Sequence, residues 1–160
     1  SDTVPVEIRK DTSRVDIVYK PFGPNWQGFF DTHISPKNTK GIEGIFTPQI
    51  SQKQFERFLN ELDQMSLREK CAYKSFNQFD FSEPPETLII RLLDKQGECY
   101  KELSQQYISR QVYGNLAGDI KELRNRIIEI TPQLKEHLRR EVQQESKSGF
   151  SFFGLFKKNK

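Results

Sequence analysis

The first fifty residues alternate between apolar and polar side chains, as β-strands do when one face meets a core and the other meets water. The alternation predicts four strands, at about residues 4–8, 15–20, 26–34 and 41–46. Because Pro5 has no backbone N–H to donate, we expect the first strand to be short or to lie at a sheet edge. The connections between these strands are short, which favours antiparallel pairing.

The hydrophobic period changes from two to about 3.6 at Ser51. Ser51 and Gln54 have the spacing of a capping box, in which each side chain satisfies a free backbone N–H at the start of a helix. Phe55, Phe58 and Leu62 then fall on one helical face. We therefore expect a helix from residue 51, and a repeat of the capping pattern at residues 66–69 predicts a second, short helix.

A nearly continuous apolar run at residues 87–93 predicts a central strand buried on both faces. Residues 94–97 have the composition of a hairpin turn and lead to a return strand at about 98–103. Apolar residues spaced by three and four positions predict a long amphipathic helix over 112–130. Thr131 and Pro132 form a helix start, so the chain continues either as a second helix or as one kinked helix. We expect residues 143–149 to form a polar linker.

The predicted fold class is α+β. We expect a mainly antiparallel sheet of five or six strands, with a long C-terminal helix and a second helix packed on one face. The expected domain organisation is a single body over residues 1–145 and a tail over residues 146–160. The chain starts at Ser1 rather than at methionine, which leaves room for a preceding segment.

Charge separates the tail from the body. The chain carries a formal charge of +3, and residues 146–160 contain four lysines and no acid. Subtracting the tail's +4 leaves −1 for residues 1–145, which is not the basic excess that nucleic-acid binding requires. We therefore expect no nucleic-acid partner. Cys71 and Cys99 form no C-x-x-C pair and are interpreted as reduced, which favours a cytoplasmic location, with peripheral membrane contact as an addition.

The tail combines aromatic and basic residues. The residues predicted to bind a partner are Phe150, Phe152, Phe153, Leu155, Phe156, Lys157 and Lys158. Three interpretations are open: docking on the protein's own core or on a second copy, recognition by a separate protein, and attachment to a membrane surface. Over its last three or four positions, the stretch 152–156 resembles the peptide that binds the bacterial sliding clamp, with phenylalanine in place of its glutamine. The likeness extends no further, and no family is assigned from it.

Asp31, His33 and Ser35 alternate along one predicted strand and so share a face. These residue types form nucleophilic triads, but neighbours two apart on a strand stand about 6–7 Å apart. We therefore predict a solvated strand face rather than a catalytic site. Two histidines without paired thiols do not suggest a zinc site, and neither common glycine-rich phosphate motif occurs. No metal and no cofactor are expected.

One pocket is predicted between the sheet and the long helix, lined by Trp26, Arg110 and Tyr113. Gly114 and Gly118 lie one helical turn apart beside it, which indicates either a close approach of helix to sheet or backbone exposed to a ligand. Trp26 belongs either to the mouth of this pocket, with aromatic residues from 76–81, or to the core.

The leading hypothesis is a non-enzymatic interaction or adaptor module that contacts a protein partner, a second copy or a membrane surface through its tail. The alternative is a small-ligand-binding domain, or an enzyme without a recognisable motif, that uses the predicted pocket.

Overall fold

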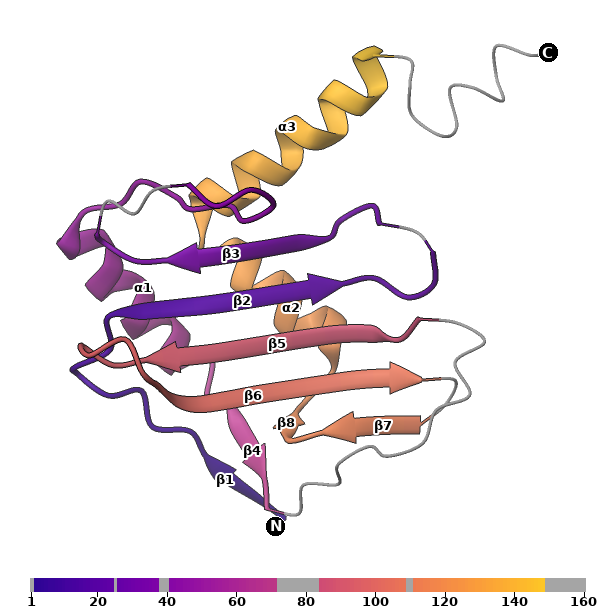
Figure 1. Cartoon of the computed structure of the whole chain (residues 1–160). Helices are drawn as coiled ribbons and strands as arrows, with labels where there is room; N and C mark the ends of the chain where they lie inside the picture. Colours follow the sequence, from indigo (N-terminus) through magenta and orange to yellow (C-terminus); the bar gives the residue numbers. More distant parts are fainter. Residues whose placement is uncertain (1, 25, 38–40, 72–83, 109–110, 149–160) are drawn as a thin grey trace.

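The main sheet holds five antiparallel strands in the order β3-β2-β5-β6-β7 (Figure 1). The computed structural model describes residues 2–24, 26–37, 41–71, 84–108 and 111–148. The five strands are β2 (Arg14–Lys20), β3 (Phe30–Ile34), β5 (Glu86–Leu93), β6 (Cys99–Ile108) and β7 (Gln111–Gly114). The predicted fold class, α+β with an antiparallel sheet of five or six strands, is confirmed.

Two helices cover one face of this sheet, α1 (Gln52–Gln64) and α2 (Ile120–Glu129), and a third, α3 (Pro132–Ser148), extends beyond the edge formed by β3 (Figure 1). The inward rows of the sheet meet the apolar stripes of the helices in one core. Its fully buried members include Ile17, Ile34, Phe55, Leu62, Leu88, Ile90, Leu92, Leu103, Ile120 and Ile127. Alternation on the strands and the helical period thus bury one face of each element.

A second, three-stranded sheet was not predicted. Its strands are β1 (Thr3–Pro5), β4 (Arg68–Lys70) and β8 (Leu116–Ala117), in the antiparallel order β1-β4-β8. The first strand is short and lies at an edge of this sheet, as its proline predicts.

The helix start at Ser51 is confirmed in its atomic detail. Ser51 Oγ accepts a hydrogen bond from the backbone N–H of Gln54 at 3.1 Å, and Gln54 Oε1 accepts one from the backbone N–H of Ser51 at 2.7 Å. The apolar strand β5 is central, as predicted, with β2 on one side and β6 on the other. It is not buried on both faces throughout, because Arg91 is exposed on the face opposite the helices.

One predicted strand in the first half of the chain starts too early, and two predicted elements there are wrong. The third strand begins at Phe30 rather than at Trp26, because residues 26–29 form a turn in which Phe29 N–H donates to Trp26 C=O. Residues 41–46 form no strand and contribute only an isolated parallel bridge between Phe46 and Thr32. The short helix after Ser66 is replaced by β4, and Ser66 has a φ of 55° that ends α1.

The predicted long helix over 112–130 is correct only in its second half. Residues 111–117 form β7 and β8, and α2 begins after Asp119, whose carboxylate accepts from the backbone N–H of Glu122. Gly114 does allow a close approach, but between β7 and β6 rather than between a helix and the sheet.

The C-terminal part of the body is helical for longer than predicted. Two separate helices meet at Pro132, which decides between the two alternatives. The polar linker predicted at 143–149 is wrong for residues 143–148, which complete α3. The expected boundary between body and tail, after residue 145, therefore falls within a helix.

Candidate functional site

The predicted partner-binding residues of the tail lie outside the described residues. They are Phe150, Phe152, Phe153, Leu155, Phe156, Lys157 and Lys158. The structure does describe the helix that leads to them. Pro132 opens α3 where a missing N–H costs nothing, and Lys135 N–H donates to Thr131 C=O in the first turn.

Only the first part of α3 packs against the body. Leu134 is fully buried and His137 and Leu138 are half-buried, whereas every side chain over residues 139–146 is exposed. Glu136 on this helix accepts hydrogen bonds from Arg139 and Arg140, and these bonds lower its pKa to about 2. At 1.5 Å per residue, the 17 residues of α3 span about 25 Å. The helix thus carries the start of the tail away from the sheet (Figure 1).

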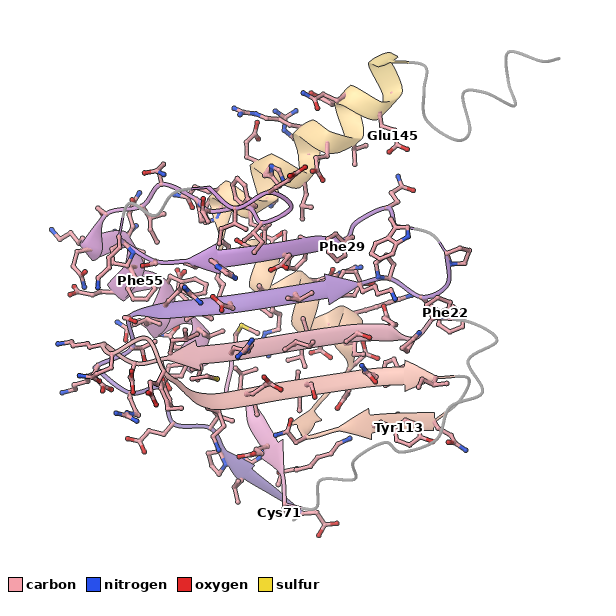
Figure 2. The ribbon with its side chains drawn as sticks, viewed as in Figure 1. Phe22, Phe29, Phe55, Cys71, Tyr113 and Glu145 are labelled. Carbon is pink, nitrogen blue, oxygen red and sulfur yellow. The ribbon has the colours of Figure 1, made fainter. Side chains whose placement is uncertain are left out.

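Trp26 and Tyr113 of the predicted pocket are not brought together. Trp26 lies in the connection between β2 and β3 and is 59% exposed, with its ring edge-on to Phe29 and the Lys20 ammonium over it at 5.2 Å. Tyr113 lies on β7, at the opposite edge of the sheet (Figure 2). Arg110 and the aromatic residues at 76–81 lie outside the described residues.

The Asp31, His33 and Ser35 face does not have the geometry of a catalytic triad. His33 Nε2 lies 3.6 Å from Oδ1 of Asp16 on the neighbouring strand, and Asp16 is held by Arg14 at 2.7 Å. Ser35 Oγ instead accepts a hydrogen bond from the backbone N–H of Lys37. The serine therefore serves the turn that follows β3.

A pocket of about 280 Å³ lies between the edge of β3, residues 44–46 and α3. One wall of the pocket is the segment 44–46, which three hydrogen bonds hold along β3. Phe46 N–H donates to Asp31 C=O at 2.8 Å. His33 N–H and the Thr32 hydroxyl both donate to Phe46 C=O. The helix wall is held by the ring of His137, which stacks on Phe46 with 4.1 Å between centroids and 11° between planes.

Aromatic and acidic side chains line this β3–α3 pocket. The residues that give it its chemical character are Phe29, Phe30, Phe46, His137, Asp31 and Glu141. Glu141 Oε1 lies 3.2 Å from His137 Nε2. Burial raises the pKa of Asp31, the Asp16 carboxylate adds to the increase, and His33 opposes it. No arginine or lysine forms an ion pair with Asp31 in the part of the chain that the structure describes.

Sequence reasoning missed this pocket. It assigned Phe46 to a strand and gave His137 no role, and the two residues are 91 positions apart. No local pattern signals a contact over that separation.

Two other pockets have different linings. One of about 180 Å³ lies between α1 and the α2–α3 junction and has an apolar floor that includes Ile34 and Phe58. The other, of about 520 Å³, is broad and open and brings three lysines together, Lys10, Lys37 and Lys95.

The described residues show no candidate metal centre and no candidate membrane span. These residues contain no group of three or more His, Cys, Asp or Glu side chains placed to hold a metal ion. Among them there is also no helix that is both long and apolar enough to cross a membrane.

Comparisons with protein-family models, with curated proteins and with solved structures gave no match. Function must therefore be inferred from the residues of this chain alone, and the two features that stand out are the projecting helix α3 and the β3–α3 pocket at its base.

Proposed function

We propose that this chain is a non-enzymatic interaction module that contacts a protein partner, or a second copy of itself, through its C-terminal tail. A membrane surface is the alternative contact. The observation that carries the proposal is the path of α3, which leaves the sheet and exposes its side chains from residue 139 to residue 146. The exposed part of α3, to which the tail is attached, therefore does not pack on the body.

The composition of the tail supports the same proposal. Five large apolar residues lie within seven positions, followed by two lysines. Burying a large apolar side chain contributes about 1.5–3 kcal/mol, so three phenylalanines would contribute several kcal/mol to a contact. The lysines would add about 1 kcal/mol each near an anionic membrane surface.

The experiment compares three full-length proteins. The wild type is tested beside a tail variant with Phe152→Ser, Phe153→Ser and Phe156→Ser. The matched control carries Phe22→Ser and Trp26→Ser, which remove exposed aromatic rings from the body instead, since these two side chains are 44% and 59% exposed. Three measurements are made on each protein: cross-linked co-purification from source cells followed by mass spectrometry, sedimentation equilibrium, and co-sedimentation with anionic and zwitterionic vesicles.

We expect a defined protein to co-purify with the wild type and with the control and to be reduced at least about tenfold for the tail variant, because one lost ring corresponds to more than 1.4 kcal/mol of binding. Loss of self-association in the tail variant alone would identify the second copy as the partner. If the tail variant loses only its binding to anionic vesicles, the membrane surface is the partner of the tail. Equal behaviour of all three proteins in all three measurements would refute the proposal.

Small-ligand binding is the second candidate function. The observation that favours it is the β3–α3 pocket, whose walls are fixed by hydrogen bonds and by the stacked rings. Its location differs from the pocket predicted at Trp26, Arg110 and Tyr113.

A further inference from the structure

The size of the β3–α3 pocket limits what it can hold. Its volume of about 280 Å³ lies near the lower end of the ~300–1,000 Å³ found for small-molecule sites. A ligand of a few non-hydrogen atoms fits, and a nucleotide or a large cofactor does not.

The lining of the pocket excludes most classes of small ligand. Asp31 and Glu141 repel an anion, and a neutral apolar ligand would remove water from both carboxylates without replacing their hydrogen bonds. A metal ion needs several ligating side chains around one point, and the described residues offer no such group. An organic cation is the class that remains.

The aromatic rings favour the same class. The face of an aromatic ring attracts a cation through its quadrupole, by about 0.5–2 kcal/mol depending on how much water is excluded. Phe29, Phe46 and His137 all contribute to the lining. Phe30 is almost fully buried and forms part of the floor, where it contacts Tyr19 at 5.9 Å between centroids.

The two acidic residues of the pocket also favour a cation. Asp31 has lost part of its hydration to burial and has gained no arginine or lysine partner within the described parts of the chain. Among the described residues, Glu141 pairs with the half-buried His137, at 3.2 Å. A positive group in the pocket would be attracted by both of these acidic residues, which line it.

We propose that the pocket formed by Phe29, Phe30, Asp31, Phe46, His137 and Glu141 binds an alkylammonium group. The ammonium lies near the carboxylates of Asp31 and Glu141, and its short carbon chain lies against the rings of Phe29 and Phe46. The group belongs either to a free amine or to a lysine side chain, including a lysine of this chain's own tail. This site is separate from the contact proposed for the tail phenylalanines.

The test is an NMR titration of the full-length, ¹⁵N-labelled protein with n-butylammonium chloride. n-Butanol serves as a neutral probe of similar shape, sodium butyrate as an anionic probe, and magnesium chloride as a metal probe. We expect butylammonium to shift the backbone signals of residues 29–31, 44–46, 137 and 141 and to bind at least about threefold more tightly than butanol.

Single substitutions test which carboxylates bind the ammonium group. Asp31→Asn and Glu141→Gln should each weaken butylammonium binding by about two- to fivefold and leave butanol binding unchanged. The matched controls are Asp63→Asn on α1 and Glu145→Gln, one turn further along α3, which lie outside the pocket lining and should have no effect. Glu141 is exposed on α3, so its substitution keeps the test open if Asp31→Asn fails to fold.

Two further arms identify the source of the ammonium group. Nα-acetyl-lysine methylamide is compared with its Nε-acetylated, uncharged form, and the titration is repeated on a variant with Lys157→Gln, Lys158→Gln and Lys160→Gln. Binding only in this lysine variant means that the protein's own tail fills the pocket of the wild type, which supports the proposal. Equal shifts by butylammonium and butanol, stronger shifts by magnesium, or no shifts in either protein would overturn it.

Discussion

Replacing Gly114 with alanine tests the most demanding contact in the fold. Gly114 has a φ of 105° and pairs with Gln105 where β7 lies against β6. A Cβ atom at this position would lie 2.2 Å from the backbone oxygen of Ser104 and 2.8 Å from its carbonyl carbon. Because both atoms belong to a paired strand, rotation of a side chain cannot relieve the overlap, and the backbone must move.

The hydrogen bonds of Asn115, the next residue, set the size of the destabilisation expected for Gly114→Ala. The Asn115 side chain accepts from Ser104 N–H at 2.9 Å and donates to Glu69 at 3.0 Å and to Glu102 C=O at 3.1 Å, while Asn115 C=O accepts from Lys70 N–H. A net hydrogen bond contributes about 0.5–1.5 kcal/mol, and a left-handed backbone costs a non-glycine residue about 1–2 kcal/mol. Loss of two or three of these bonds together with the strain predicts a destabilisation of about 3–5 kcal/mol, a large part of the ~5–15 kcal/mol of a typical domain.

The matched control is Gly97→Ala in the β5–β6 turn. Gly97 also has a positive φ, 82°, but an added Cβ would meet nothing within 4 Å. Only the backbone strain applies, so we expect a loss of about 1–2 kcal/mol. Urea unfolding followed by far-ultraviolet circular dichroism gives both free energies of unfolding. The reasoning is refuted if Gly114→Ala costs no more than Gly97→Ala.

Two further substitutions test the core and the start of α1. Tyr19 donates to the buried carboxylate of Glu86 at 2.7 Å, and burial, together with Glu86, raises the pKa of Tyr19 to about 12. The stabilisation from this hydrogen bond should therefore be fully present below the pKa of about 10 of unfolded tyrosine, and should be lost as the pH rises toward 12. Over this range the urea midpoint should fall in the wild type and much less in Tyr19→Phe. An equal fall of the urea midpoint in both proteins would contradict the role given to Tyr19. Ser51→Ala should lower the free energy of unfolding by about 1 kcal/mol because the capping box is lost, whereas Gln52→Ala, one residue on, should change it little.

Local signals in the sequence predicted the elements that local contacts determine. The capping box at Ser51 needs only residues three positions apart, and the alternation in β2 reflects the apolar row that faces the core, so both were predicted correctly. The hairpin turn between β5 and β6 was also predicted correctly, and Gly97 has the positive φ that this kind of turn uses.

The predictions failed where distant residues decide the conformation. Val112 and Leu116 match the helical period of α2 only by coincidence, since Val112 is 49% exposed at a sheet edge and Leu116 is buried in β8. The charged strand β4 has no apolar alternation at all. Its Glu69 is held by Lys101 at 2.7 Å and by Asn115, from parts of the chain that lie 32 and 46 positions away.

The same limit applies to the candidate site. The contact between Phe46 and His137 joins a loop to the last helix, and neither segment carries a motif. Tail composition could be recognised from the sequence, whereas the direction of α3 depends on this contact and on the burial of Leu134.

The Phe46–His137 stack links the two proposals physically. The ring of His137 is both a wall of the β3–α3 pocket and one of the few contacts that hold α3 against the body. A ligand that binds between the walls is therefore favoured by the docked position of α3, and it stabilises that position in return. Because such coupling between binding free energies is reciprocal, a partner that binds the tail only when α3 is docked would strengthen ammonium binding by the same factor. A partner that binds the tail equally well in every position of α3 would leave the affinity for ammonium unchanged.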